Sequence, residues 1–165
     1  MTKKIALNGL FVALALVVSY IEVLIPIPTG IPGIKIGLAN GVIMVLIWLT
    51  TWKQALIVSV VRIVLAGLLF GNPVTIVYSL AGGILSLIIM ILLKKTKVFS
   101  PVGISAAGGV GHNVGQLTIA VLLMENAKIY LYLPVLLVSG TITGVVIGVL
   151  AAILISKIPK RLMEI

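Results

Sequence analysis

The stretch Ser100–Gln116, SPVGISAAGGVGHNVGQ, decides the fold class and locates the candidate site. It contains five glycines and the single histidine of the chain, yet it opens a long apolar run. On a helix that turns about 100° per residue, its small and polar residues share one face and its larger apolar residues share the other. Inside a membrane, such a polar face must meet a partner or a water-filled cavity. The small face holds Ser105, Gly108, Gly109, His112 and Gln116, flanked by Asn113 and Gly115, and the apolar face holds Val110, Val114, Leu117 and Val121.

The composition indicates an integral membrane protein with a single domain over residues 1–165. Hydrophobic residues make up 61% of the chain and charged residues only 9%, whereas a soluble domain is roughly half apolar and a quarter charged. The mean hydropathy is +1.36. Because a spanning helix needs about 20 residues, this length predicts about six spans with short loops. The net charge of +9 would suggest nucleic acid in a soluble protein. Here the basic residues lie between apolar runs, so we expect contacts with the lipid bilayer and none with nucleic acid.

The first apolar run resembles a signal peptide only in part. Lys3 and Lys4 precede it, and Ala13-Leu14-Ala15 mimics a cleavage site. The run continues to Leu24, however, beyond the ~7–15 apolar residues of a signal peptide. We therefore expect it to form the first membrane helix. The absence of cysteine excludes disulfides and thiolate metal sites.

The apolar pattern predicts an all-α bundle of six transmembrane helices, over residues 4–24, 36–50, 53–70, 73–93, 101–124 and 134–156. Ile25–Lys35 holds three prolines and two glycines and is predicted to be an extended connection. With the N-terminus inside, nine basic residues lie on the inner side and two on the outer side. The excess of positive charge predicts a multi-pass protein of the cell membrane with both termini in the cytoplasm. The inner residues are Lys3, Lys4, Lys53, Lys94, Lys95, Lys97, Lys157, Lys160 and Arg161, and the outer ones are Lys35 and Lys128.

The chemistry of the chain argues against catalysis. The sequence has no aspartate, and its three acids are Glu22, Glu125 and Glu164. Paired carboxylates for acid–base catalysis or for magnesium are therefore missing. There is no glycine-rich loop for ATP phosphates. We expect no enzyme activity, no metal and no cofactor, and we expect binding and passage of a small-molecule substrate instead.

Arg62 is the strongest single signal, because an arginine in the middle of a membrane helix is costly without a partner. One interpretation is an internal ion pair or contacts with carbonyl groups, and Glu22 is the nearest acid by position. The other is a cation that awaits an anionic ligand. His112, Asn113 and Gln116 have the same two interpretations, as interhelical hydrogen bonds or as ligand contacts. By topology, several polar residues of different helices converge toward the outer half and predict a pocket open to the outside. The candidate substrate-binding residues are Glu22, Lys35, Asn40, Arg62, Tyr78, His112, Asn113 and Gln116.

A second pattern lies on the first helix, where Ala6, Gly9 and Ala13 form a stripe of small residues. Small residues at this spacing let another helix approach closely. The stripe is expected either to pack inside the bundle or to dock another membrane subunit.

Several segments resemble a family of small membrane proteins called heptaprenyl diphosphate synthase component I, or Gx transporters. That family is similar to the substrate-binding S components of energy-coupling factor (ECF) transporters. The segments PGIKIGLAN and GHNVGQ carry the most specific part of the resemblance. The matching segments are Pro32–Asn40, Arg62–Gly71, Ser79–Gly83, Ser100–Gln116, Tyr132–Pro134 and Ser139–Gly144.

The resemblance implies a six-helix bundle with a ligand pocket near the outer face. It also implies a transmembrane coupling subunit with two cytoplasmic ATPase subunits as partners. In S components, a small-residue motif on the first helix docks to the coupling subunit, and the stripe Ala6, Gly9 and Ala13 matches it with glycine where alanine is usual. The enzyme name conflicts with the residues, because prenyl diphosphate synthases hold magnesium with aspartate-rich motifs.

Three functions follow from these observations. The first is an S component that captures a small anionic vitamin-, quinone- or isoprenoid-like molecule for ATP-driven import. The second is a non-catalytic membrane subunit of a prenyl diphosphate synthase. The third is a scaffold in which Arg62 and His112 satisfy one another.

Overall fold

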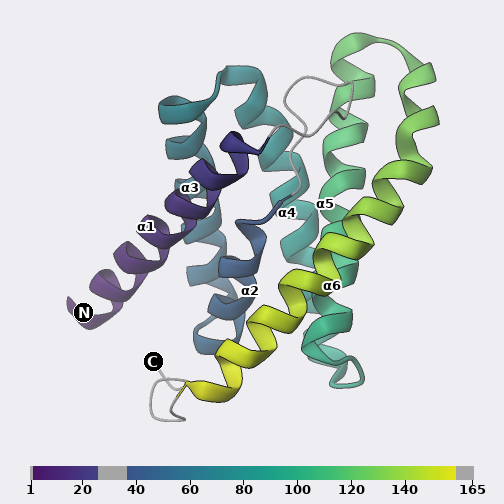
Figure 1. Ribbon diagram of the computed structural model, residues 1–165. Coiled ribbons are helices and arrows are strands. Elements are labelled where there is room, and N and C mark those ends of the chain that lie inside the picture. The colour runs from purple at the N-terminus through teal and green to yellow at the C-terminus, as the bar shows by residue number, and fades with distance from the viewer. Residues whose placement is uncertain (1, 26–36, 159–165) are drawn as a thin grey trace.

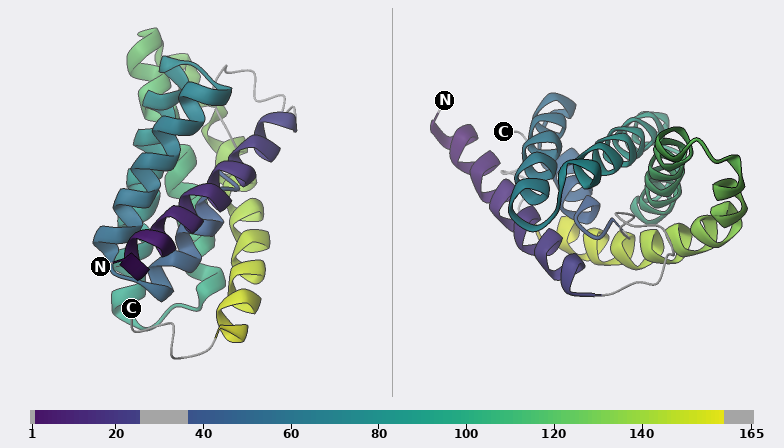
Figure 2. Two further views of the ribbon diagram at one scale, coloured as in Figure 1. Left: turned by 90° about the vertical axis from the view of Figure 1, so that its left-hand side faces the viewer. Right: turned by 90° about the horizontal axis from the view of Figure 1, so that it is seen from above.

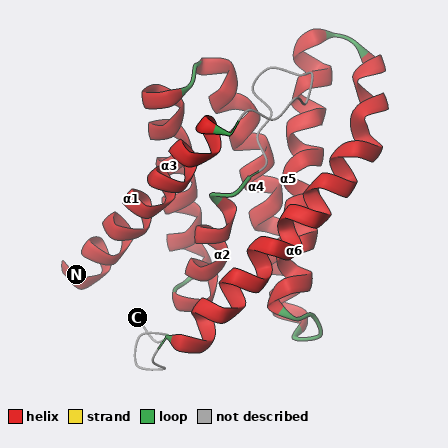
Figure 3. Cartoon of the chain, viewed as in Figure 1, coloured by secondary structure: helices red, strands yellow, loops and turns green. Residues whose placement is uncertain are grey.

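The computed structural model describes residues 2–25 and 37–158, and these form helices and connections without a strand (Figure 3). The six predicted helices are confirmed, and a short 3-10 helix precedes the last of them. The extended connection predicted before residue 36 lies almost entirely outside the described residues. The elements are α1 (Thr2–Leu24), α2 (Asn40–Leu49), α3 (Trp52–Phe70), α4 (Pro73–Thr96), α5 (Pro101–Met124), η1 (Ala127–Tyr132) and α6 (Leu133–Lys157).

Local sequence signals set the starts of three helices. The side chains of Asn72 and Ser100 accept hydrogen bonds from the first turns of α4 and α5, and a proline follows each of them. Proline suits this position because its missing N–H would have no helical partner there. Thr51 and Gln54 form a reciprocal capping box at the start of α3. These caps explain why the predicted starts of the three helices agree with the structure to within a residue.

Four helical segments are long and apolar enough to cross a membrane: Ile5–Leu24, Trp52–Phe70, Pro73–Thr96 and Ala127–Lys157. Of the six predicted membrane helices, these four have the length and composition that a crossing needs. α2 is shorter than the predicted 36–50, because residues 37–39 form a turn. Its ten residues span about 15 Å, half of an apolar bilayer core of about 30 Å. In α5, the glycines and polar residues lower the hydropathy.

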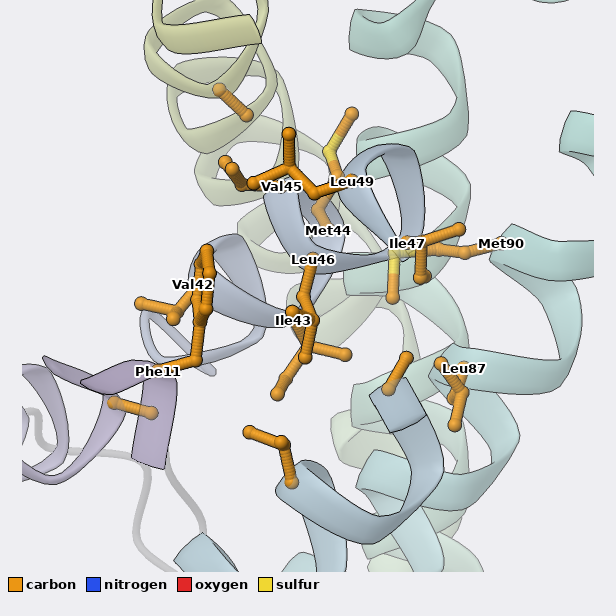
Figure 4. Packing of buried hydrophobic residues seen from close by; sticks show 14 of the residues in the cluster. Phe11, Val42, Ile43, Met44, Val45, Leu46, Ile47, Leu49, Leu87 and Met90 are labelled. Atoms are coloured by element: carbon orange, nitrogen blue, oxygen red, sulfur yellow. The ribbon is translucent and has the colours of Figure 1, made fainter. Parts of the chain in front are cut away.

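The apolar core surrounds α2. Eight of its ten residues are buried, and they pack against side chains from α1, α4 and other helices (Figure 4). Phe11 approaches from α1, and Leu87 and Met90 approach from α4. Because α2 is short and enclosed, its first turn lies at mid-height of the bundle rather than at an end (Figure 1). The polar residues at this turn therefore lie inside the protein.

The helices α4, α5 and α6 approach one another more closely, backbone against backbone. A Cβ atom on Gly109 of α5 would lie 2.3 Å from the carbonyl oxygen of Gly140 on α6. On the other side of α5, a Cβ on Gly115 would lie 2.7 Å from the carbonyl oxygen of Ala81 on α4. Only glycine fits at such contacts, so small residues on these three helices serve mutual packing.

The start of α1, the end of α6 and the α2–α3 and α4–α5 connections all lie at one end of the bundle (Figures 1 and 2). Lys53, Lys94, Lys95, Lys97 and Lys157 lie at or near this end. Lys94 donates a hydrogen bond of 2.6 Å from Nζ to the carbonyl oxygen of Ile47, near the end of α2. Its Nζ also lies 4.9 Å from the ring centre of Trp48. This lysine therefore ties the last turn of α2 to α4.

Candidate functional site

The turn before α2 is held by a carboxylate from α1. Glu22 is 6% exposed, and its Oε1 accepts hydrogen bonds from the backbone N–H groups of Gly37 and Leu38. Non-helical backbone inside a membrane bundle needs such partners, because no water satisfies its polar groups there. Glu22 thus fixes the depth and direction at which the chain enters α2.

Asn40, the first residue of α2, joins two polar side chains from different helices. Nη2 of Arg62 on α3 donates to Oδ1 of Asn40 at 2.5 Å. Nδ2 of the same asparagine lies 2.9 Å from Nδ1 of His112 on α5. All three side chains are buried. Arg62 and His112 are therefore linked through Asn40, and the three residues form a hydrogen-bonded relay.

Gly37 makes this relay possible. Its φ of +84° lies in the left-handed region, which favours glycine. A Cβ at this position would lie 2.9 Å from Cδ2 of His112 and 3.0 Å from Nδ2 of Asn40. A side chain here would therefore push the asparagine and the histidine apart.

Glu22, Arg62 and His112 line one small cavity together with Gly37, so opposite charges share a confined volume. The cavity volume is about 10 Å³, which is room for about one water molecule. Nε of Arg62 has no hydrogen-bond partner among the described residues. A buried N–H group without a hydrogen-bond partner is costly in free energy. The remaining lining residues are Ser19, Ile63, Ala66, Gly67, Thr75 and Ser79.

The structure brings together Glu22, Asn40, Arg62 and His112 of the eight predicted binding residues, and it places Asn113 and Tyr78 in other surroundings. Asn113 points toward α6, where its Nδ2 donates to the carbonyl oxygen of Leu136 at 2.7 Å. Gln116 is fully buried against α4 near His112, since a Cβ on Gly82 would lie 2.8 Å from Cγ of Gln116 and 2.9 Å from Nδ1 of His112. Tyr78 packs in a second apolar cluster with Leu117 and its neighbours. Lys35 lies outside the described residues.

The predicted site did not include three hydroxyl residues of the cavity wall, nor Gly37. Ser19 lies one turn before Glu22, and Thr75 and Ser79 lie one turn apart on α4. The helical spacing of these residues was the available signal. Gly37 was the fourth, and only its backbone conformation reveals its role.

An apolar groove of about 310 Å³ lies on the other side of the α2 start, between α1, α2 and α6. It adjoins the polar centre, by which we mean Glu22, Gly37, Asn40, Arg62 and His112. Leu38 and Gly41 line the groove, whereas Gly37 and Asn40 belong to the polar centre. The two environments are thus separated by a single turn of the chain. The groove residues are Phe11, Leu14, Val18, Leu38, Gly41, Val42, Val45, Ile147, Leu150, Ala151 and Leu154.

The stripe of small residues on α1 faces outward. Ala6, Gly9 and Ala13 are all exposed, and a Cβ on Gly9 would meet no atom within 4 Å. Within the described part of the chain, the stripe therefore does not pack inside the bundle.

The donor set of the polar centre suits an anion better than a metal ion. A guanidinium repels cations and binds carboxylate or phosphate oxygens. Within the described ranges, no group of three histidine, cysteine, aspartate or glutamate side chains is placed to hold a metal. The one carboxylate of this arrangement, Glu22, already accepts two backbone N–H groups.

Comparison with known proteins gives one match. The model of the family described as heptaprenyl diphosphate synthase component I matches residues 11–154. No curated protein and no solved structure matches the chain. The matched range contains the whole polar centre, from Glu22 to His112. The chain is a helical protein with apolar helices able to cross a membrane, and it belongs to the heptaprenyl diphosphate synthase component I family.

Proposed function

We propose that the protein is the substrate-binding membrane component of an energy-coupling factor type importer. It captures a small anionic molecule of vitamin-, quinone- or isoprenoid-like character at the outer face of the cell membrane. ATP-driven uptake follows when it associates with a transmembrane coupling subunit and two ATPase subunits. Both termini lie in the cytoplasm in this proposal, as the distribution of lysines favours.

The observation that carries the proposal is the buried cation at the polar centre. Arg62 is 5% exposed, donates to Asn40 through Nη2, and keeps an Nε–H group without a hydrogen-bond partner among the described residues. A purely structural arginine would be expected to have its donors satisfied. An anionic group in the adjoining cavity would meet this need.

The apolar groove supports a ligand with a substantial apolar part. Its volume of about 310 Å³ is about twice that of a cavity known to take one benzene ring. It would hold a ring system or about two isoprenyl units, next to the polar centre that would hold the charged group. We assign the groove to that part of the substrate.

The cavity must enlarge to admit such a molecule, and α1 is the element placed to move. α1 packs against α2 and α3, whereas α5 lies between α4 and α6. Glu22 on α1 forms one wall of the cavity and also holds Gly37 and Leu38. A shift of α1 would release this turn and open the polar centre, while the glycine-packed helices α4 to α6 stay in place.

The exposed stripe Ala6, Gly9 and Ala13 is the docking surface for the coupling subunit in this proposal. Its outward direction and the open space at Gly9 support that assignment. Docking on α1 would also couple the partner to the helix that carries Glu22.

The family description favours one rival function, a non-catalytic membrane subunit of a prenyl diphosphate synthase. This rival needs a soluble enzyme as the partner, because the chain has no aspartate to hold magnesium. It predicts a stable complex with that enzyme and no dependence on ATPases.

Native mass spectrometry of the protein in mild detergent tests the proposal. A small-molecule adduct is expected on the native protein, retained by Arg62→Lys and lost from Arg62→Met, with both variants folded. Lys53→Met, which removes an exposed cation at the start of α3, serves as the control. No adduct, together with a co-purified polyprenyl synthase, would overturn the importer in favour of the rival. Unfolding of both Arg62 variants would favour a scaffold.

A further inference from the structure

Asn40 lies between a group that only donates and a ring that can donate or accept. Nη2 of Arg62 lies 2.5 Å from Oδ1 of Asn40, and Nδ2 of Asn40 lies 2.9 Å from Nδ1 of His112. A guanidinium has N–H donors and no acceptor, so the asparagine atom that faces it must be the oxygen. The amide nitrogen, with its two hydrogens, is then the atom that faces His112.

This orientation decides which ring nitrogen carries the proton. Because the amide nitrogen donates, Nδ1 of His112 accepts and carries no proton. An uncharged imidazole whose Nδ1 is bare has its proton on Nε2. We propose that Asn40 is a positioning residue that holds His112 as the uncharged Nε2–H tautomer, so that the polar centre offers donors to an oxyanion of the substrate.

The ring of His112 lies between Gly37 and Gly82, with a different edge toward each glycine. A Cβ on Gly37 would lie 2.9 Å from Cδ2 and 3.2 Å from Nε2 of His112. On the opposite side, a Cβ on Gly82 would lie 2.9 Å from Nδ1. The Nε2 edge thus faces the turn at Gly37, and both Gly37 and His112 line the polar cavity.

The resulting set of groups selects the chemistry of the ligand, a step that rests on the proposed function. Arg62 and the Nε2–H edge of His112 supply donors at one cavity. The charged groups that line it are Arg62 from α3 and Glu22 from α1, and Glu22 already accepts two backbone N–H groups. A carboxylate, phosphate or diphosphate offers only acceptors and fits this set. An amine or amide would bring further donors to a site that already offers donors, so it fits less well.

The single histidine of the chain makes the tautomer directly measurable. In protein labelled with ¹⁵N-histidine, one protonated and one bare ring nitrogen give separate signals near neutral pH. The expected result is a protonated Nε2 and a bare Nδ1. A protonated Nδ1 in the native protein, with or without a proton on Nε2, would overturn the proposal without recourse to any variant.

Two pairs of variants test the role of Asn40. Asn40→Asp offers His112 a carboxylate oxygen, so the proton is expected to appear on Nδ1. Asn72→Asp is the matched control, since its side-chain oxygen accepts from Thr75 N at 2.9 Å and aspartate caps a helix equally well. Arg62→Lys keeps a donor to Asn40 and should retain the Nε2–H tautomer. Arg62→Met removes it and should give a mixture. An unchanged tautomer in both Asn40→Asp and Arg62→Met would show that Asn40 does not position the ring.

Inorganic pyrophosphate is the probe for the ligand class. It should shift the Nε2 signal in the native protein and in Asn72→Asp, with at least a tenfold weaker response in Asn40→Asp. An absence of any shift in the native protein would overturn the oxyanion assignment. Failure of the importer function is distinguishable, because it would appear as a missing adduct and a missing coupling module while the histidine spectrum stayed as described.

Discussion

The helices α5 and α1 both carry small residues at helical spacing, and they use them in opposite ways. On α5, glycines meet the backbones of α4 and α6, so that a Cβ on Gly109 would approach the carbonyl oxygen of Gly140 to 2.3 Å. On α1, Gly9 meets nothing within 4 Å. The same sequence signal therefore marks a close contact with a neighbouring backbone in one place and an open surface in the other. We call the side formed by α4, α5 and α6 the closed side, because these helices pack against one another. We call the small-residue face of α1 the open side, because no other helix packs against Gly9.

The largest expected effect tests the closed side. Gly109→Ala places a methyl group against backbone that cannot rotate away, and we expect a loss of about 3 kcal/mol of unfolding free energy, the upper end for overpacking. Thermal unfolding in detergent measures the change. Gly103→Ala on the same helix is the control, because its Cβ would come no closer than 3.7 Å to a neighbouring atom. Equal stability of the two variants would contradict the comparison.

The next effect concerns the turn between the two sides. Gly37→Ala forces alanine into a left-handed conformation, at about 1–2 kcal/mol, and crowds His112 and Asn40. We expect a protein that stays folded but loses the relay, with a changed ¹⁵N spectrum of its histidine. A native-like histidine spectrum in this variant would contradict the prediction, because it would mean that an alanine side chain fits beside His112 and Asn40.

A smaller effect is expected at the end of α2. Lys94→Met removes the hydrogen bond from Nζ to the carbonyl oxygen of Ile47 and should cost about 1 kcal/mol of unfolding free energy. Lys95→Met, at the exposed neighbouring position, should change stability little. Unfolding followed by the fluorescence of Trp48 reports the difference, since this ring lies beside Lys94. Identical unfolding curves for Lys94→Met and Lys95→Met would show that Lys94 does not stabilise α2.

The smallest effect on stability is expected on the open side. Gly9→Leu meets free space and should change the unfolding free energy by no more than about 0.5 kcal/mol. It should nevertheless reduce co-purification with a coupling module, because a leucine there keeps a partner helix at a distance. Gly9→Ala restores the residue type usual in S components and should retain the complex. Full assembly of the Gly9→Leu variant would refute the assignment of the stripe.

The helices were predictable because hydropathy and capping residues act locally. The stretches after Asn72 and Ser100 begin as helices for reasons that lie within four residues of each start. The start of α2 was not predictable in this way. The turn at residues 37–39 is held by Glu22 from another helix, a tertiary contact that no local pattern contains.

The polar residues of the site were predictable by type but not by partner. Periodicity placed His112, Asn113 and Gln116 near one face of α5, yet Asn113 turns toward a different helix from His112. His112 meets Asn40, and Asn113 meets Leu136. Residues one position apart point about 100° away from each other on a helix, so the choice of neighbour depends on the packing of α4 and α6. The central part played by Asn40 follows only from distances across three helices.

The length of α2 has a consequence for biogenesis. Its ten residues are too few to be inserted into the bilayer as an independent segment, and its walls come partly from α4 and α6, which are synthesised later. We therefore expect α2 to remain outside its final place until the C-terminal helices have been made. Because the chain has no cysteine, single cysteines at Val42 or Val45 in ribosome-bound chains of increasing length would report this directly. Protection from a water-soluble thiol reagent before α6 has emerged would show that α2 enters the membrane early.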